Sequence, residues 1–209
     1  LLERAPDGIT ADDVIKACRL HSDEKVRTAD IGTKVHDWIS EYINAKKPAM
    51  PDDSAVIKGV TSFLEWQDNN KVKFTASEEI IYSRKYDYCG SLDFEARING
   101  KLYLGDFKTS NALYNDVLMQ TAAYAMARTE ESGIEYDGRY LLRLAKETEE
   151  EHQNRTRGKN QAYVEPYKVF EAIPTQEGLK EDYRAFLAFQ HGFLWNKESE
   201  KRLKELKKL

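Results

Sequence analysis

The sequence predicts an α/β protein in which a mixed central β-sheet is flanked by helices. Two segments of alternating polarity, 91–98 and 101–108, surround Asn99-Gly100, the dipeptide most typical of a tight β-hairpin. A strand-like segment precedes this hairpin, and segments with apolar residues at helical spacing lie before and after it. This order of elements favours one sheet with helices on both faces.

The other elements follow from hydrophobic periodicity and from capping and breaking residues. Helices are expected over 11–20, capped by Thr10, over 28–45, from Asp52 or Asp53 to 68, over 114–129 and over 175–196. Further strands are expected over 74–83, 138–145 and 161–170, with Pro166 placing the last of them at an edge or a bulge. The predicted sheet therefore begins with three antiparallel strands, followed by a helix and a further strand.

Composition sets limits on the class of protein. With 209 residues and 41% hydrophobic content, the chain is expected to form a single domain over 1–209, with its motifs in 30–130. The chain does not begin with Met, so we expect a segment upstream of Leu1. No apolar run approaches the roughly 20 residues that a membrane-spanning helix requires.

Cysteine content and net charge narrow the interpretation further. Cys18 and Cys89 lie far apart, which excludes a disulfide framework and a four-cysteine iron–sulfur or zinc site. An intracellular setting is expected, cytoplasmic in a bacterium or a phage-infected cell, with an organelle also compatible. The net charge of −4 disfavours a protein that coats nucleic acid but is compatible with an enzyme that gathers acids at a metal site. Gly-rich phosphate loops and G-x-S-x-G elbows are absent from the sequence, which disfavours kinases, dinucleotide enzymes and serine hydrolases.

The hairpin places two acids face to face. A two-residue turn at Asn99-Gly100 puts Asp93 directly opposite Asp106, and Lys108 lies on the same face. Alternation puts Ser91, Asp93, Glu95 and Arg97 on one face of the first strand and Leu92, Phe94, Ala96 and Ile98 on the other. Carboxylates directly opposite each other on paired strands repel, so the pairing costs stability unless a cation cancels it. The alternative is an exposed hairpin face on which Lys108 merely neutralises Asp106.

Four motifs carry a family resemblance. Asp93 followed by Asp106-Phe107-Lys108 resembles the signature of the PD-(D/E)XK nuclease superfamily. The string GTKVHDWISEYI, with His36, is similar to the G-x-x-x-H helix of the RecB-like branch, and SEEIIYS followed by YCGSLD resembles its strand motif, with Glu78 as the matching acid. Glu79 is expected on the opposite face of its strand. Gln120 and Tyr124 in MQTAAYA match the Q-x-x-x-Y motif of the same branch.

The resemblance implies a fold, a cofactor and roles for these residues. It implies a restriction-endonuclease-like core and a site for Mg²⁺ or Mn²⁺ held by Asp93 and Asp106, with His36 and the carbonyl of Phe107 completing it. Lys108 would orient or deprotonate the attacking water and stabilise the phosphate, and Glu78 would assist from the neighbouring strand. Gln120 and Tyr124 would position the DNA strand that is cut.

The resemblance also suggests the kind of nuclease. The chain lacks the four cysteines of the iron–sulfur RecB-like nucleases, and it is more similar to single-domain exonucleases of phage and bacterial recombination or of mitochondrial genome maintenance. The expected substrate is DNA with free, single-stranded ends. Two alternatives stay open: a catalytically inactive nucleic-acid-binding module, which would be expected to lose Lys108 or one acid, and a structural protein with an ion-pair network.

Two further segments have both a structural and a functional interpretation. The charged segment 146–160 is expected to be a solvated loop, although its Arg155 and Arg157 could contact a phosphate backbone. The aromatic residues of the expected helix over 175–196 are typical of core packing and less often form a platform for base stacking. The tail 197–209 is expected to continue as a fraying amphipathic helix.

Overall fold

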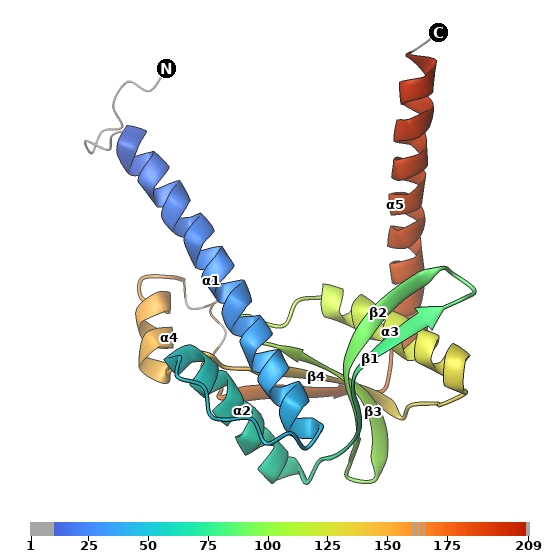
Figure 1. Ribbon diagram of the computed structural model, residues 1–209. Helices are drawn as coiled ribbons and strands as arrows, with labels where there is room; N and C mark the ends of the chain where they lie inside the picture. The colour runs from blue at the N-terminus through green and yellow to red at the C-terminus, as the bar shows by residue number, and fades with distance from the viewer. Residues whose placement is uncertain (1–10, 161, 163, 165, 208–209) are drawn as a thin grey trace.

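Over the residues that the structure describes, the protein is an α/β protein with a five-stranded mixed sheet and five helices packed against it (Figure 1). The computed structural model describes the backbone of residues 11–160, 162, 164 and 166–207, and side chains within these ranges from residue 26 onward. In chain order the elements are α1 (Ala11–Ile43), α2 (Ser54–Asn70), β1 (Lys73–Ser83), β2 (Tyr88–Ile98), β3 (Lys101–Lys108), α3 (Asp116–Ser132), β4 (Gly138–Leu144), α4 (Glu149–Thr156), β5 (Phe170–Thr175) and α5 (Leu179–Leu206).

The sheet has the strand order β1-β2-β3-β4-β5. Strands β1, β2 and β3 form an antiparallel meander, and α3 then carries the chain to β4, which pairs in parallel with β3. Strand β5 closes the sheet antiparallel to β4. The mixed sheet predicted from the sequence is therefore confirmed, including the antiparallel start and the helix before the next strand.

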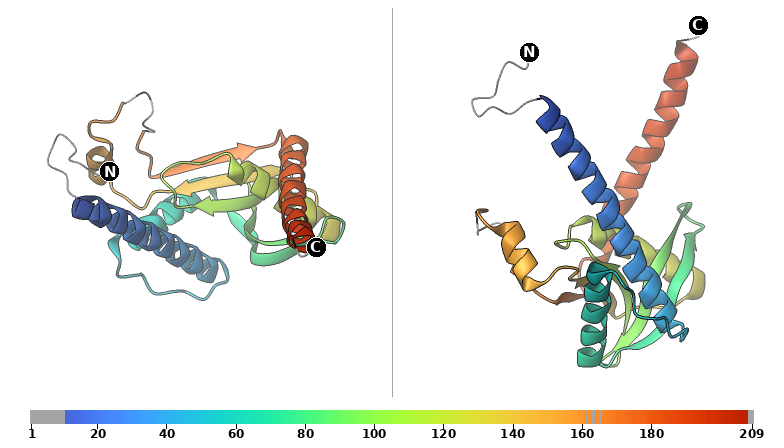
Figure 2. Two further views of the ribbon diagram at one scale, coloured as in Figure 1. Left: turned by 90° about the horizontal axis from the view of Figure 1, so that it is seen from above. Right: turned by 60° about the vertical axis from the view of Figure 1, so that its left-hand side comes forward.

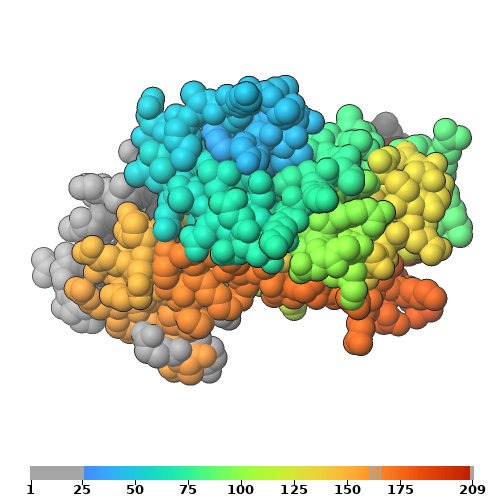
Figure 3. Space-filling model, turned by 90° about the horizontal axis from the view of Figure 1, so that it is seen from below, coloured from blue at the N-terminus to red at the C-terminus, as the bar shows by residue number. Residues whose placement is uncertain are grey.

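Helices cover both faces of the sheet (Figures 1 and 2). On one face, α1 and α2 pack on an aromatic core whose centre includes Phe63, Trp66, Phe94 and Phe107. From below, α2 and the β2–β3 hairpin lie side by side on this part of the surface (Figure 3). On the other face, α3 packs on a smaller cluster and α5 packs against α3. Both α1 and α5 extend well beyond the sheet on the same side of the molecule (Figure 1).

The hairpin has the predicted two-residue turn. Asn99 and Gly100 have positive φ values of 51° and 83°, as a type I′ turn requires. Ile98 pairs with Lys101, and this register continues to the pair of Phe94 and Gly105. The ladder ends at this pair, one position before Asp93 and Asp106, and the Phe107 N–H donates to the Asp93 carboxylate from β3. The predicted turn and hairpin register are therefore confirmed, while the direct pairing of the two acids stays a prediction.

The predicted alternation along β2 is wrong at one point. Leu92 packs with Ile81 and Leu104 on the α3 face, whereas Phe94 belongs to the aromatic core under α1 and α2. The change of face occurs where Glu78 has a φ of 53° and the β1–β2 ladder has no pair between Glu78 and Asp93. A left-handed residue in a strand changes the direction of the neighbouring side chains, which simple alternation does not anticipate.

Helix α1 is one continuous helix from Ala11 to Ile43 and is therefore longer than either of the two helices predicted there. The sequence analysis divided it into helices over 11–20 and 28–45, but residues 21–27 contain neither Gly nor Pro to end the first of them. The predicted cap Thr10 lies outside the described residues. None of the helices in the described part of the chain is long and apolar enough to cross a membrane.

Boundaries in the C-terminal half differ from the prediction in two places. The predicted strand over 161–170 is wrong: the strand is β5, Phe170–Thr175, and it carries Pro174 at the sheet edge, where a missing N–H is tolerated. The predicted helix over 175–196 instead begins at Leu179, after Gly178 with a φ of 76°, and its continuation into the tail as far as Leu206 agrees with the prediction.

The predicted loop over 146–160 contains the short helix α4. Thr148 and Glu151 form a capping box, in which the Thr148 hydroxyl accepts from the Glu151 N–H and the Glu151 carboxylate accepts from the Thr148 N–H. This S/T-x-x-E pattern is visible in the sequence. The segment lacks the apolar residues that usually identify a helix, so the capping box was its principal signal.

The turn that sets the register gives a stability prediction. Gly100→Val places a β-branched side chain at a φ of 83°, which we expect to lower the free energy of unfolding by about 2 kcal/mol. Urea unfolding followed by circular dichroism measures this change. Lys101→Ala, at the exposed neighbouring position, is the control and should change the stability little. An equal effect of the two substitutions would contradict the assigned turn.

Candidate metal centre

Residues from three consecutive strands and from two helices meet at one place. His36 comes from α1, Glu78 from β1, Asp93 from β2 and the pair Asp106 and Lys108 from β3, while Gln120 and Tyr124 reach the site from α3. The structure thus brings together seven of the side chains that the sequence analysis selected, although 88 residues separate the first from the last.

Three of these side chains form a compact donor group. Ligand atoms of His36, Glu78 and Asp93 all lie within 4.8 Å of one another. Asp106, which was also predicted to be a ligand, lies outside this group and is paired with Lys108. Glu78, which was expected only to assist, therefore occupies a more central position than the sequence analysis gave it.

His36 reaches the site because α1 approaches the end of β3 closely. Gly32 lies one helical turn before His36, and a Cβ atom there would come within 2.9 Å of Thr109 Oγ1. The His36 ring makes an edge contact with Phe107, and its Nδ1 lies 3.6 Å from Asp93 Oδ2. Burial lowers the pKa of His36, which leaves the imidazole neutral at neutral pH, as a metal ligand must be.

Asp93 is held by the backbone of the neighbouring strand. The Phe107 N–H donates to Asp93 Oδ2 at 2.6 Å, which fixes the carboxylate beside β3. Burial raises the pKa of Asp93 to about 7, against the opposing effects of this hydrogen bond and of Lys108. The carbonyl of Phe107 was expected to be a ligand; the described contacts concern only its N–H and its buried ring.

Asp106 is the most deeply buried acid of the site. Its residue is 1% exposed, and Lys108 Nζ lies 2.8 Å from its Oδ2, although no hydrogen bond of good geometry reaches this oxygen. Burial, and then the neighbouring Asp93, raise the pKa of Asp106 to about 7. The carboxylates of Asp93 and Asp106 each disfavour the negative charge of the other. Such a pair is typical of a site where a bound cation compensates both charges.

Lys108, Gln120 and Tyr124 form a hydrogen-bonded chain from β3 to α3. Lys108 Nζ donates to Gln120 Oε1 at 3.0 Å, and Gln120 Nε2 donates to the Tyr124 hydroxyl oxygen at 3.0 Å. Because that oxygen accepts from Gln120, the Tyr124 hydroxyl proton is available to another acceptor. The Tyr124 ring lies against the backbone at Gly90, where any Cβ atom would overlap it.

A second polar network, which sequence analysis did not identify, fixes α3 over the meander. Arg128 is paired with Glu79 at 2.6 Å and donates from Nε to the buried Glu95 at 2.9 Å, and the Tyr136 hydroxyl also donates to Glu95. Arg128 lies four residues after Tyr124, on the same side of α3. This repeated spacing of Gln120, Tyr124 and Arg128 was the available signal in the sequence.

This network separates the two adjacent glutamates. Glu79 is held on the α3 face by Arg128, while Glu78, in its left-handed conformation, lies with His36 and Asp93 and accepts from Ser91 Oγ at 3.2 Å. The expectation that Glu79 faces away from Glu78 is confirmed. A left-handed conformation of a non-glycine residue costs about 1–2 kcal/mol, which the surrounding contacts must offset.

The residues present fit a divalent cation. One neutral imidazole and two carboxylates supply nitrogen and oxygen donors from three different elements, a set that suits Mn²⁺ and also Mg²⁺. Asp106 adds a buried carboxylate with an underused oxygen beside this group. Among the described side chains, Lys108 is the cationic partner of these acids. One ammonium group cannot neutralise the three carboxylates of Glu78, Asp93 and Asp106.

The two arginines proposed as phosphate contacts lie in a different network. Arg155 on α4 makes two hydrogen bonds to Glu147, at 2.9 and 2.7 Å, and contacts His152. Arg157 follows α4 and donates to Asn154 at 3.0 Å. Neither arginine has a described contact with the acids of the site, so their role in binding phosphate stays a prediction.

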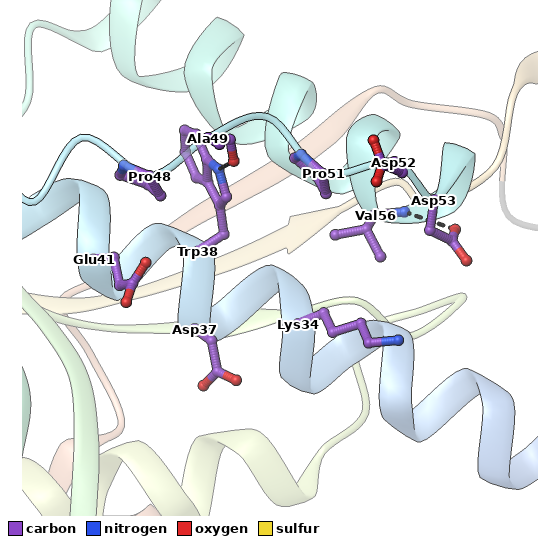
Figure 4. Close-up of a pocket in the computed structure, with 10 residues that line it drawn as sticks. All are labelled: Lys34, Asp37, Trp38, Glu41, Pro48, Ala49, Pro51, Asp52, Asp53 and Val56. Atoms are coloured by element: carbon purple, nitrogen blue, oxygen red, sulfur yellow. Dashed lines mark hydrogen bonds between the residues drawn. The ribbon is translucent and has the colours of Figure 1, made fainter.

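A hollow elsewhere on the surface lies apart from the candidate metal centre. It has a volume of about 590 Å³, lies between α1 and the segment before α2, and is lined by residues that include Trp38 and Asp53 (Figure 4). Trp38 Nε1 donates to the Ala49 carbonyl, and Asp53 accepts from two N–H groups at the start of α2. Lys34, on its rim, pairs with Asp30. These polar groups serve the ends and surface of helices.

Comparison with known proteins adds no assignment. No protein-family model matches the chain, and no curated protein matches its sequence.

The raised pKa values predict how the metal-free protein responds to pH. A carboxyl whose pKa is about 7 in the folded state and about 4 unfolded stabilises the fold fully below pH 4, and this contribution is lost as the pH rises through 7. We expect a loss of up to roughly 4 kcal/mol per carboxyl, measured by urea unfolding in EDTA between pH 4.5 and 7.5. Asp106→Asn cannot ionise and should flatten this dependence. An identical slope in the variant would show that Asp106 is not the group responsible.

The Arg128 network gives a second stability prediction. Arg128→Met leaves the buried Glu95 carboxylate without its cation, and we expect a loss of about 3 kcal/mol in the free energy of unfolding. Adding Glu95→Gln should restore part of the loss, because the unpaired charge is then removed. Arg184→Met, at an exposed arginine of α5, is the control and should change stability by less than about 0.5 kcal/mol. Equal losses for the two arginines would contradict the network.

Proposed function

We propose that the protein is a metal-dependent nuclease with a restriction-endonuclease-like core, which hydrolyses DNA phosphodiester bonds at free, single-stranded ends. The observation that carries the proposal is the joint position of Asp93, Asp106 and Lys108 beside the donor group of His36 and Glu78. Buried acids that repel one another, with a lysine between them and α3, suit a site where a cation and a phosphate meet. A purely structural network would not need three carboxylates for one lysine.

In this proposal the acids and His36 hold the cation. Asp93, Glu78 and His36 would bind it, with Asp106 adjacent. A bound Mg²⁺ or Mn²⁺ would supply Lewis-acid polarisation of a phosphate oxygen. The Phe107 N–H keeps Asp93 turned toward this position, because its hydrogen bond to Oδ2 ties the carboxylate to β3.

Lys108 has a hydrogen-bond donor to spare. Its ammonium group has three N–H donors; Gln120 Oε1 accepts from one of them, and the ion pair with Asp106 lies beside another. The third can donate to the attacking water or to the charge that develops on phosphate in the transition state. Asp106 and Gln120 therefore fix the position of the ammonium group without occupying it fully.

Gln120 and Tyr124 orient the substrate strand. Both polar atoms of the Gln120 amide are engaged: Oε1 accepts from Lys108, and Nε2 donates to Tyr124. The Tyr124 hydroxyl proton is thereby directed away from Gln120 and can donate to a phosphate oxygen of the strand. Tyr124 thus couples the position of the strand to the position of Lys108.

Cleavage assays test the proposal. We expect wild type to degrade end-labelled single-stranded DNA with Mg²⁺ or Mn²⁺, and Asp106→Asn and Lys108→Ala each to reduce the rate at least about 100-fold. Lys34→Ala, at an exposed lysine of α1, is the control and should cleave like wild type. Circular single-stranded DNA should resist cleavage, because it offers no end.

Two outcomes would overturn the proposal. Wild type that cleaves no DNA with either cation would exclude the nuclease function, and DNA binding retained under the same conditions would support a catalytically inactive binding module. Cleavage at the wild-type rate by both active-site variants would show that another site is responsible.

A further inference from the structure

We propose that the hollow beside Gln120 and Tyr124 binds an unpaired nucleobase of the strand whose phosphate reaches Lys108; this rests on the proposed function. The hollow has a volume of about 350 Å³ and lies between β2, α3 and α5. It is lined by Tyr88, Cys89, Asp116, Met119, Gln120, Tyr124, Phe186 and Phe189.

The hollow shares two side chains with the candidate metal centre. Gln120 and Tyr124 line it, and the same two side chains form the chain that leads to Lys108 and Asp106. A phosphate at Lys108 therefore leaves the adjoining nucleotide beside Gln120.

One wall of the hollow is rigid and aromatic. Tyr88 and Phe186 contact edge to face, with ring centroids 4.8 Å apart. The Tyr88 hydroxyl donates to the Ala123 carbonyl at 2.8 Å, which ties this ring to α3. A preformed wall of this kind can receive the flat face of a base without losing much side-chain freedom.

Phe189 gives the hollow an exposed aromatic side. It is 70% exposed, although it lies on α5 one turn from Phe186, which packs on Tyr88. A base has apolar faces and polar edges, and the hollow offers matching groups: aromatic rings on its sides, and Asp116 and the second Nε2–H of Gln120 for the edges. A base inside a duplex has both faces stacked and its edge paired, so only an unpaired base fits.

Binding of oligonucleotides to the full chain tests this site. With Ca²⁺ replacing Mg²⁺, Phe189→Ala should weaken binding of a single-stranded oligonucleotide about ten-fold or more, as the loss of one base–aromatic stack implies. Phe193→Ala is the matched control: it lies one turn further along α5, it is 66% exposed, and it does not line the hollow. Its affinity should equal that of wild type. Unchanged affinity in Phe189→Ala, or an equal loss in both variants, would overturn the inference.

Cys89 provides a second measurement inside the hollow. Its exposed thiol should react with an alkylating agent, and a single-stranded oligonucleotide should slow this reaction, as followed by peptide mass spectrometry. An oligonucleotide of the same length that lacks bases should protect Cys89 much less. Equal protection by both would show that the backbone alone covers the thiol, and would overturn the inference.

The two proposals fail in different ways. Wild type that cleaves single-stranded DNA while Phe189→Ala binds it unchanged would reject the base site and leave the nuclease function standing. Wild type that neither binds nor cleaves DNA would reject both.

Discussion

The repulsion between Asp93 and Asp106 is the constraint on which the rest of the site depends. The Asn99-Gly100 turn brings the two acids together, and their burial makes the charge on each costly. The fold does not remove this cost with an equal number of cations, because Lys108 is the one basic group in contact with Asp106 among the described side chains. The same arrangement therefore lowers the stability of the metal-free protein and forms the proposed site for a metal ion.

The surrounding elements can be understood as devices that maintain this arrangement. Gly32 allows α1 to approach β3 so that His36 reaches Asp93, and the Phe107 N–H turns Asp93 toward the same point. Arg128 holds Glu79 and Glu95 under α3, which leaves Glu78 directed toward the donor group. The helix that carries Arg128 also carries Gln120 and Tyr124, so α3 positions both the Arg128 network and the two residues proposed to contact the substrate.

The hairpin and most of the site residues could be predicted from the sequence, because they depend on local turn chemistry and short motifs. The Asn-Gly turn predicted the register of the hairpin, and short motifs selected the side chains that meet at the site. What could not be predicted depends on tertiary contacts. Glu78 takes a left-handed conformation in β1, and on the paired strand β2 Leu92 lies on the face opposite to Phe94. The position of β5 after Pro166, and the exposure of Phe189 on a helix expected to be core, likewise depend on what packs beside them.

The central claim is that these acids form a cation site, and electron paramagnetic resonance of Mn²⁺ tests it most directly. The metal-free chain, titrated with Mn²⁺ without DNA, should bind one ion at the site and show coupling to an imidazole nitrogen. The chain has four histidines. His36→Gln should therefore abolish the nitrogen coupling if His36 is the ligand, and His191→Gln should leave it intact. Absence of bound Mn²⁺, or nitrogen coupling that persists in His36→Gln, would contradict this account.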